Sequence, residues 1–408
     1  MTALRRPAVL AAATALLLAG CGTGGQAPAE TEDGTVTSTA TATSAETSAE
    51  PTATPGAGEA AALPPAVEDA LGAFVDAGAV AAVVHLSDGG SAWAGAAGVA
   101  DVERGTTPAV DAPVRIASIT KAMVATVVVR LAERGELALD DLVADHLPGV
   151  LPEEQPVTVR HLLDHTSGMP GSDALAFTDV DGALAALGRA WTEEELVASA
   201  LAKPWGAAPG TAFSYANENY VVLGMLVEEL TGAGLAAVLE EEVFAPAEMS
   251  ATTYPDDATM PADALRGYLF SGPDPTSELV EVTEQEPSVW NAGAAVVSTA
   301  PDVTRFFRAL FDGTLVSAES LAQMQAVGVE GYGLGLLAGG DACGVQPPEL
   351  VLGQRGNGVG YRAISLASPD GERQATLVWT GTALDPAADP LEGPMNDLLV
   401  TALAATCP

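Results

Sequence analysis

The stretch IASITKAM, residues 116–123, contains Ser118 and, three positions later, Lys121. Lys121 is one of only two lysines in this chain of 408 residues, which otherwise draws its positive charge from arginine. A desolvated lysine can lose its proton and act as a general base, whereas arginine stays protonated. On a helix the two side chains would lie one turn apart, so the pattern predicts a serine hydroxyl activated by a lysine. The alternatives are an incidental lysine and a serine that only caps a helix.

The residues after Ser118 have the spacing of a helix with an apolar face. The apolar positions on that face are Ile119, Met123, Val124, Val127, Val128 and Leu131. The pattern predicts a helix that begins at Ser118. The unpaired N–H groups and the dipole at a helix N-terminus favour a developing oxyanion, which suits a nucleophile of acyl transfer.

Strand patterns lie near both ends of the chain, and the middle is largely helical. Apolar runs on either side of Asp88-Gly89-Gly90 predict a hairpin. Three further strand-like runs lie within 349–381, and helical patterns flank the two groups near 63–78 and 389–405. We therefore predict an α+β fold, in which an antiparallel sheet built from both chain ends is flanked by helices and residues 116–330 form an inserted, mostly helical lobe. A site is expected in the cleft beside that lobe.

A second polar pair lies in PGTAFSYANENYVVLGMLVEELTG, residues 209–232. Tyr215 and Asn217 precede an amphipathic helix that is expected to end at Thr231-Gly232. A tyrosine near a lysine can relay a proton, and an asparagine amide can hold a substrate carbonyl. Taken alone, Tyr215 would equally suit a core position and Asn217 a helix cap.

The N-terminal region has the pattern of an exported protein. Residues 1–20 contain Arg5-Arg6 and then a short apolar run, as a signal peptide does. Leu18-Ala19-Gly20-Cys21 resembles the lipobox of bacterial lipoproteins, which implies a lipid on Cys21; an ordinary signal peptide with an incidental cysteine is the alternative. Residues 21–62 are rich in Thr, Ser, Ala, Pro and Glu and predict a disordered stalk. The domain is expected to span 63–408, outside the membrane that anchors it.

Cysteines, charge and histidines restrict the function further. Cys343 and Cys407 form an even pair in an exported domain, which predicts one disulfide. The formal net charge of −38 excludes nucleic-acid binding. His161 and His165 have the spacing of one helix face, but residue 162 is Leu where a zinc-protease motif has Glu, so structural roles are expected for both. We expect no metal and no organic cofactor.

Five stretches, read in chain order, resemble landmarks of the serine β-lactamase and penicillin-binding-protein superfamily. They are SITK at 118–121, HLLDHTSGM at 161–169, PGTAFSYAN at 209–217, NAGAAVVSTAPDVTRFFRAL at 291–310 and YGLGL at 332–336. The resemblance covers roughly 65–405 and is strongest to class C β-lactamases, D-alanyl-D-alanine carboxypeptidases and related esterases. It implies the β-lactamase/transpeptidase-like fold, in agreement with the strand and helix patterns.

The resemblance implies roles for individual residues. Ser118 corresponds to the acylated nucleophile, Lys121 to its base and Tyr215 to the proton relay. Asn217 corresponds to the contact with the substrate amide. The backbone N–H of Asn357 would join that of Ser118 in an oxyanion hole.

The third motif of that superfamily departs from its usual form here. It has His or Lys, a small residue and Gly, whereas this chain has Gln354-Arg355-Gly356. Gln354 carries no charge, which reduces electrostatic help for a substrate carboxylate, and Arg355 should point to the other face of the strand. The departure favours neutral esters or amides as substrates.

The sequence as a whole predicts an exported, lipid-anchored serine hydrolase that forms an acyl-enzyme on Ser118. The activity expected first is that of a D-alanyl-D-alanine carboxypeptidase on cell-wall peptides, with a β-lactamase or a secreted esterase as alternatives within the family. A catalytically inactive binding module is the alternative from another class. The expected partners of this monomeric chain are a substrate with an amide or ester carbonyl and, through the lipid on Cys21, the membrane.

Overall fold

The computed structural model describes residues 60–328, 330–344 and 350–408. Cys21, the predicted signal peptide and almost all of the predicted stalk lie outside the described residues. The described residues belong to one compact unit. Ala61–Ala62, which precede residue 63, form a strand of its main sheet, and the expected domain boundary stays a prediction.

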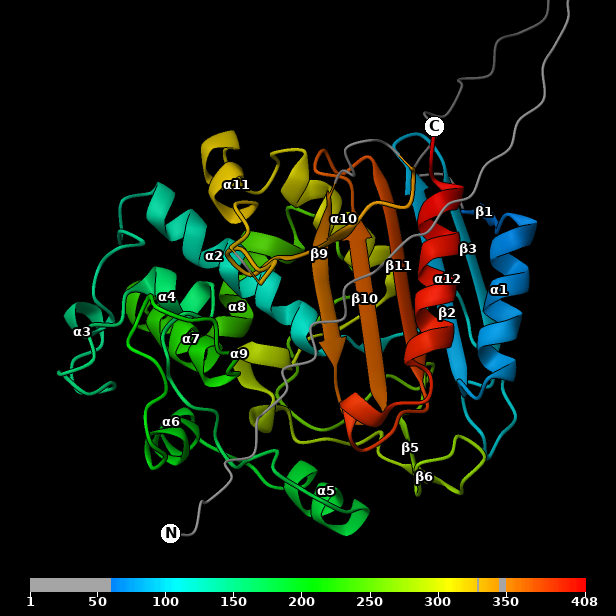
Figure 1. Ribbon diagram of the computed structural model, residues 1–408, viewed down its shortest axis with the longest axis horizontal. Coiled ribbons are helices and arrows are strands. Elements are labelled where there is room, and N and C mark those ends of the chain that lie inside the picture. Colours follow the sequence, from blue (N-terminus) through cyan, green and yellow to red (C-terminus); the bar gives the residue numbers. More distant parts are fainter. Residues whose placement is uncertain (1–59, 329, 345–349) are drawn as a thin grey trace, which may run out of the picture. The chain divides into compact units, whose positions relative to one another are not determined.

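A seven-stranded sheet forms the centre of this unit (Figure 1). Its strands, in order across the sheet, are β1 (Ala61–Ala62), β3 (Ala92–Gly98), β2 (Ala81–Asp88), β11 (Arg373–Thr380), β10 (Tyr361–Ala367), β9 (Leu350–Asn357) and β8 (Leu337–Gly340). The two chain ends meet where β2 pairs with β11, with Ala81 opposite Thr380. The predicted sheet built from both ends is therefore confirmed.

The edge of the sheet differs from the prediction. All neighbouring strands are antiparallel except β1, which runs parallel to β3. The pattern gave no sign of β1, because two alanines show no alternation of apolar and polar residues.

Both faces of the sheet are covered by helices. Successive residues of a strand point to opposite faces, so Val83 joins one hydrophobic core and Val84 the other. The helices α1 (Pro65–Asp76) and α12 (Glu392–Ala405) pack side by side over the Val84 face (Figure 1). On the Val83 face α10 (Ala300–Phe311) contacts β2, β10 and β11. Each fully buried Val or Leu contributes about 1.5–3 kcal/mol to this packing.

The middle of the chain forms the predicted helical lobe beside β9. Its α-helices are α2 (Thr120–Glu133), α3 (Val143–His146), α4 (Val159–Leu163), α5 (Val180–Leu187), α6 (Glu193–Leu201), α7 (Glu218–Thr231), α8 (Leu235–Leu239), α9 (Asn291–Ala294) and α11 (Ala318–Met324). Short turns of 3-10 or π type add η1 (Ala117–Ile119), η2 (Glu240–Phe244) and η3 (Pro287–Val289) to it, whereas η4 (Pro386–Ala388) lies outside the lobe, between β11 and α12. Two small strand pairs complete it, β4 (Val114–Arg115) with β7 (Val297–Ser298) and β5 (Tyr268–Phe270) with β6 (Leu279–Glu281).

The helix α2 is buried on all sides rather than on one face. Every residue from 120 to 129 is buried, including Lys121 and Thr126. The prediction of one apolar face was too narrow, because α2 lies between α7, α8 and α9 and has no solvent face along this length. Its N-terminal end is therefore held rigidly.

Local signals explain where the other lobe helices begin and end. Thr158 and Thr192 each form a capping box with the residue three positions on, so α4 and α6 begin there. The helix α7 ends at Gly232, which has the left-handed φ of 66° that glycine adopts without strain. The predicted end of this helix is confirmed.

The two paired histidines do not share a helix face. The helix α4 ends at Leu163, and His165 lies beyond it with a left-handed φ of 59°. His161 instead closes the capping box of α4 with Thr158. The prediction of one helix face was wrong because the chain turns sharply after residue 163.

A disulfide joins Cys343 to Cys407, so the chain end after α12 is tied to the connection between β8 and β9. Asp341 lies beside these cysteines and pairs with Arg373. This group is the one cluster of potential metal ligands within the described residues, and its two cysteines have no free thiolate to offer.

No single helix in the described part of the chain is long and apolar enough to cross a bilayer. The bent pair formed by α7 and α8 with η2 meets the criterion only by combined length and composition.

Candidate active site

Ser118 lies in the 3-10 turn η1, which leads directly into α2, so it comes just before the helix and not in it. The chain enters this turn at Ala117, whose φ of 47° is unusual for a residue with a side chain. Such backbone strain is found most often at functional sites. The end of strand β9 packs closely against this bend. A Cβ added to Gly356 would lie only 2.1 Å from the Ile116 carbonyl oxygen.

Lys121 points back from the first turn of α2 to the serine. Its Nζ lies 3.1 Å from Ser118 Oγ. The same Nζ donates to Asn217 Oδ1 at 2.8 Å and to the Gly293 carbonyl oxygen at 2.8 Å. The side chain is fully buried, so the amine contacts only these groups and the tyrosine rings around it.

Three oxygen atoms surround Lys121 Nζ at hydrogen-bond distance, namely Asn217 Oδ1, the Gly293 carbonyl oxygen and Ser118 Oγ. The direction of Nζ that Asn217 and Gly293 leave open faces Ser118 Oγ, so a proton can move between the two side chains along it. The arrangement is that of a nucleophile and its base within hydrogen-bond reach.

Tyr215 completes the group from the loop before α7. Its hydroxyl donates to Ser118 Oγ at 3.0 Å, and its side chain is 45% exposed. The ring packs on His165 with centroids 4.2 Å apart. Tyr215 therefore joins the buried serine to the outside of the site.

His165 supports the tyrosine without taking part as a charged group. Burial lowers the pKa of His165 well below its usual value, and the charge of Lys121 lowers it further. Its Nδ1 accepts from the Asn219 side chain at 2.9 Å and faces the Ala216 N–H at 3.4 Å. The ring is therefore a neutral, fully buried platform, as the sequence predicted in assigning it a structural role.

Asn217 occupies the N-cap position of α7, and its side chain lies beside Lys121. It is the residue before α7, yet its side chain makes no capping hydrogen bond, and its Oδ1 binds Lys121. The backbone behind the pair is tight, since a Cβ on Gly293 would lie 3.4 Å from Lys121 Nζ. The expected contact of Asn217 with a substrate amide would have to use the Nδ2 group.

Gln354 lies on the site-facing side of β9 but is turned to structural partners. It is 3% exposed, and its Nε2 donates to the Tyr332 hydroxyl at 2.9 Å and to the Gly335 carbonyl oxygen at 3.0 Å. Both N–H bonds of the amide are thus used. The expected contact of Gln354 with substrate stays a prediction, and it would require the amide to exchange one of these two partners.

Arg355 faces away from the site, as its position on the strand predicted. It binds Glu392 on α12 with two nitrogen–oxygen contacts, the longer at 2.7 Å. It also donates to Asn357 Oδ1 at 3.2 Å. Neither residue 354 nor residue 355 therefore offers a positive side chain to the site.

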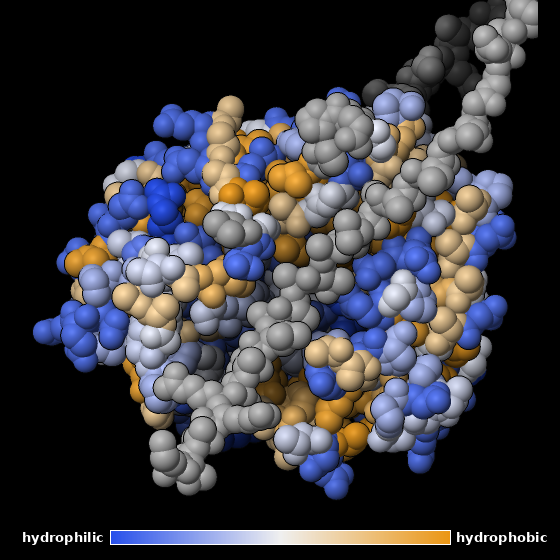
Figure 2. All heavy atoms as spheres, viewed as in Figure 1, coloured by the Kyte–Doolittle hydropathy of each residue, from blue (hydrophilic) through white to orange (hydrophobic). Residues whose placement is uncertain are grey.

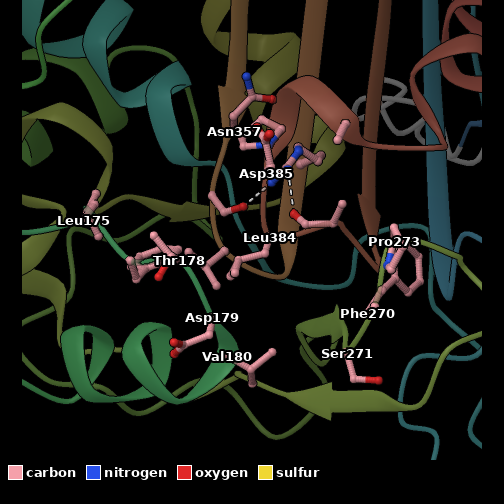
Figure 3. A pocket seen from close by; sticks show the side chains of 18 of the residues that line it. Leu175, Thr178, Asp179, Val180, Phe270, Ser271, Pro273, Asn357, Leu384 and Asp385 are labelled. Atoms are coloured by element: carbon pink, nitrogen blue, oxygen red, sulfur yellow. Dashed lines mark hydrogen bonds between the residues drawn. The ribbon is translucent and has the colours of Figure 1, made fainter.

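A large cavity opens at the end of β9, and its lining includes Gly358, which lies close to Ala117, but not Ser118 itself. It has a volume of about 760 Å³ and is lined mainly by apolar groups, with Asn357 and Gly358 on one side. Figure 3 shows Leu175 and Thr178 on one wall, Leu384 and Asp385 near β9, and Phe270 and Pro273 beyond them. Apolar side chains also gather at the surface between α5 and the β5–β6 hairpin (Figure 2). The cavity can hold an apolar part of a substrate.

Three site residues were given no role from the sequence. Gly293 and Tyr332 lie inside stretches that carried the family resemblance, but nothing in the letters showed that a glycine carbonyl would bind Lys121 or that Tyr332 would hold Gln354. Glu218 follows Asn217 directly and is buried beside it. The sequence signal that could have identified Glu218 was its position in YANEN, residues 215–219, between two asparagines.

Comparison with known proteins gives a consistent result. The family model described as Beta-lactamase matches residues 67–398. Penicillin-binding protein 4 of Amycolatopsis lactamdurans is 33% identical over 245 residues, which cover 55% of this chain and 60% of that protein. Esterase EstB of Burkholderia gladioli is 32% identical over 283 residues, which cover 60% of this chain and 70% of the esterase. The match therefore covers less than two thirds of the penicillin-binding protein and slightly more than two thirds of the esterase.

Solved structures match over more of the chain. A D-amino acid amidase from Ochrobactrum anthropi SV3, solved with L-phenylalanine amide, has a TM-score of 0.73 and 27% identity and covers 83% of this chain and 97% of that one. A D-stereospecific amidohydrolase from Streptomyces sp. has a TM-score of 0.69 and 29% identity and covers 78% of this chain and 94% of that one.

Proposed function

The chain belongs to the Beta-lactamase family of serine hydrolases, and we propose that it hydrolyses uncharged amides or esters through an acyl-enzyme on Ser118. The single observation that carries the proposal is the arrangement around Lys121 Nζ. The amine is buried, gives its N–H bonds to Asn217 and Gly293, and lies 3.1 Å from Ser118 Oγ. In this proposal the buried amine accepts the serine proton, because Ser118 Oγ lies in its remaining hydrogen-bond direction.

In the proposed acylation step Ser118 Oγ attacks the substrate carbonyl carbon and its proton passes to Lys121 Nζ. The negative oxygen of the tetrahedral intermediate is stabilised by the backbone N–H groups of Ser118 and Asn357. Tyr215, 3.0 Å from Ser118 Oγ and partly exposed, passes the proton to the leaving amine or alcohol. The bond to the leaving group then breaks and the acyl group remains on Ser118.

In deacylation, water attacks the acyl carbon and gives its proton to the same Lys121 and Tyr215 pair. The ester bond to Ser118 breaks, the serine recovers a proton, and the carboxylic acid leaves. These proposed steps use the residues of this chain and no cofactor.

The surroundings of Ser118 favour an uncharged substrate over one that carries a carboxylate near β9. Gln354 is fully engaged with Tyr332 and Gly335, and Arg355 binds Glu392 on the other face of the sheet. A substrate carboxylate would therefore find no positive partner in either residue, and Arg362, which lines the large cavity, is paired with Asp389. The apolar cavity and the likeness to an esterase and to two D-selective amidases agree with this substrate class.

A D-alanyl-D-alanine carboxypeptidase activity on cell-wall peptides is the second candidate. The similarity to penicillin-binding protein 4 favours it, as does the export pattern of the N-terminal sequence. It would require carboxylate recognition by groups other than residue 354. A β-lactamase activity would use the same acylation chemistry, and only the rate of deacylation would distinguish it.

The test is the intact mass of residues 60–408 after separate exposure to a penicillin, to an aryl ester and to an amino acid anilide. Ser118→Ala is the matched control, since the serine hydroxyl is the only group removed. We expect Ser118-dependent turnover of the ester and the anilide. A long-lived penicillin adduct would favour the carboxypeptidase, and rapid penicillin hydrolysis a β-lactamase. If a folded sample shows neither adduct nor turnover with any of the three, the proposal fails and a binding module takes its place.

We also propose that the chain is exported and anchored through a lipid on Cys21, with the domain outside the membrane as a monomer. The support is the sequence before residue 22 and the acidic surface, which disfavours binding to nucleic acid. Fractionation of cells making the full chain and a Cys21→Ser variant tests this. The variant should leave the membrane fraction, and retention there would contradict the anchor.

A further inference from the structure

Glu218, the first residue of α7, has a carboxylate oxygen without a partner. The residue is only 5% exposed, and its Oε2 is buried with no hydrogen-bond partner among the described residues. No arginine, lysine or histidine in the described part of the chain forms an ion pair with it. Leaving a buried carboxylate oxygen unpaired is costly, more so than for a neutral group.

The position at the start of a helix does not explain this burial. An acidic side chain in the first turn interacts favourably with the helix dipole, but that benefit is also available when the side chain is exposed. Glu194 in the first turn of α6 is such an exposed case. Glu218 is instead enclosed, so another interaction must compensate for the burial when the site is occupied.

The Glu218 side chain lines a small pocket that adjoins the reacting group. The pocket has a volume of about 140 Å³, and Glu218 lines it together with Tyr215 and Asn217. Gly171 forms the opposite wall, since a Cβ added there would lie 3.5 Å from Glu218 Oε2. Lys203 approaches the same wall, but its Nζ binds the Gly171 carbonyl oxygen and Asp173.

The small pocket also borders the large apolar cavity. Leu175 and Trp290 line both of them. A substrate whose carbonyl lies at Ser118 can thus reach Glu218 with a small polar group and the large cavity with an apolar group. The polar group must be a cation that donates hydrogen bonds, because the pocket offers it a carboxylate oxygen.

We infer that this pocket binds the ammonium group of the substrate, so that the preferred substrates are amides or esters of compounds with a free amine close to the reacting carbonyl, such as amino acids. The inference rests on the proposed hydrolysis at Ser118. The ammonium would donate to the Glu218 carboxylate and pair with its charge. An apolar substituent on the same molecule would occupy the neighbouring cavity. The inference makes Glu218 a residue for specificity and leaves proton transfer to Lys121 and Tyr215.

The test compares substrates that differ only in the amine. D- and L-phenylalanine p-nitroanilide carry the ammonium, and 3-phenylpropionic p-nitroanilide has the same ring and carbonyl without it. The wild-type chain should favour one of the amine-bearing anilides by about tenfold or more in kcat/KM, the range of a charge-assisted hydrogen bond. Glu218→Gln keeps the shape of the side chain and should lower kcat/KM for that anilide about 10-fold or more, while the value for the deamino anilide changes less than threefold.

Glu194→Gln is the matched control, because it also removes one acidic group from the first turn of a helix but at an exposed site. It should leave the ratio between the substrates unchanged. An unchanged ratio in Glu218→Gln, with Ser118-dependent turnover of both anilides, would overturn the inference and leave the proposed function intact. Absence of Ser118-dependent turnover of every anilide and ester would overturn both.

A binding measurement covers the case in which Glu218→Gln does not fold. Ser118→Ala protein should bind phenylalanine amide at least about tenfold more tightly than 3-phenylpropionamide, measured by calorimetry. This advantage should disappear as the pH rises through about 8, where an α-amine loses its proton. Equal affinity for the two amides at pH 6 would also overturn the inference.

Discussion

The beginning of α2 and the end of β9 both border the reacting serine, and they use their polar groups differently. At the beginning of α2, Ser118 and Lys121 contact each other and Tyr215, so every polar atom points to the place of reaction. At the end of β9, Gln354 points to Tyr332 and Gly335, and Arg355 points to Glu392. The first region holds reacting groups, and the second holds a strand in position.

The difference indicates which part of the site must stay the same when the substrate changes. Acyl transfer needs a nucleophile and a base at hydrogen-bond distance, and that requirement is the same for every substrate. Recognition of a charged leaving group is needed only for some substrates, so a strand residue can exchange that task for a structural one. The substrate class should therefore follow from β9 and from the pocket at Glu218, and the reaction class from α2.

The largest effect is expected from Lys121→Arg. The guanidinium keeps its proton, so it cannot accept the one from Ser118, and acylation should fall about 10³-fold. The measurement is the rate of Ser118 acylation by an aryl ester, followed by intact mass. Melting temperature and near-ultraviolet circular dichroism must show that the variant is folded, and Lys121→Met provides a second variant of smaller volume. Near-native acylation by folded Lys121→Arg would remove the base role and with it the contrast between the two regions.

A smaller effect, about 10²-fold in kcat/KM, is expected from Gly356→Ala. The added Cβ would lie 2.1 Å from the Ile116 carbonyl oxygen, so the end of β9 and the N–H of Asn357 must move away from Ser118. Gly358→Ala is the matched control, because the nearest atoms to its added Cβ lie at 3.4 Å. Gly358→Ala should keep activity within threefold of wild type. Equal activity of both variants would show that the β9 backbone does not support the reaction.

Gln354→Leu should affect stability more than activity. The change leaves the Gly335 carbonyl oxygen and the Tyr332 hydroxyl without their donor inside the protein, which should lower the free energy of unfolding by about 2 kcal/mol. Urea unfolding measures this, with the exposed Gln323→Leu as a control that should change it by less than about 0.5 kcal/mol. Turnover of a neutral anilide should stay within fivefold. A hundredfold loss of kcat/KM without loss of stability would mean that Gln354 contacts substrate after all.

The smallest effect is expected in the pH dependence of stability, through residues that pack behind Lys121. Burial raises the pKa of Glu193 to about 7, and the nearby Glu228 carboxylate acts in the same direction against a hydrogen bond from Asn291. Asn291 begins α9, whose Gly293 carbonyl binds Lys121. A carboxyl with a raised pKa in the folded state stabilises the fold at acid pH, and this contribution is lost as the pH rises from about 4.5 through 7.

Glu193→Gln should therefore raise the melting temperature relative to wild type by more at pH 8 than at pH 5. Glu195→Gln, on the exposed side of α6, is the control and should show no such trend. An equal difference at both pH values would exclude Glu193 as the source of pH dependence behind the reacting region.

The sequence predicted the elements whose signals are local. The hairpin of β2 and β3, the three strands β9, β10 and β11 and the helix ending at Gly232 follow from alternation and turn residues, and the structure has them. The proximity of Ser118 and Lys121 follows from their spacing near the start of one helix. The edge strand β1 was missed because two alanines carry no pattern.

Contacts between distant segments could not be predicted in the same way. The direction of the Gln354 amide depends on Tyr332, and the burial of Glu218 depends on the loop at Gly171. His165 was placed on a helix because spacing alone does not show that α4 ends at Leu163. Each of these features depends on where another part of the chain packs, and no short pattern encodes it.

The pairing of β2 with β11 has a consequence for how the chain is made. Ala81 meets Thr380, which is synthesised about 300 residues later. The hairpin of β2 and β3 must therefore wait, with one edge unpaired, until the last tenth of the chain has appeared. Folding that depends on such distant partners is slow, and partly made chains are prone to aggregate. A chain cut before residue 373 should thus yield no folded fragment, and the finished protein should depend on chaperones that keep it extended until synthesis ends.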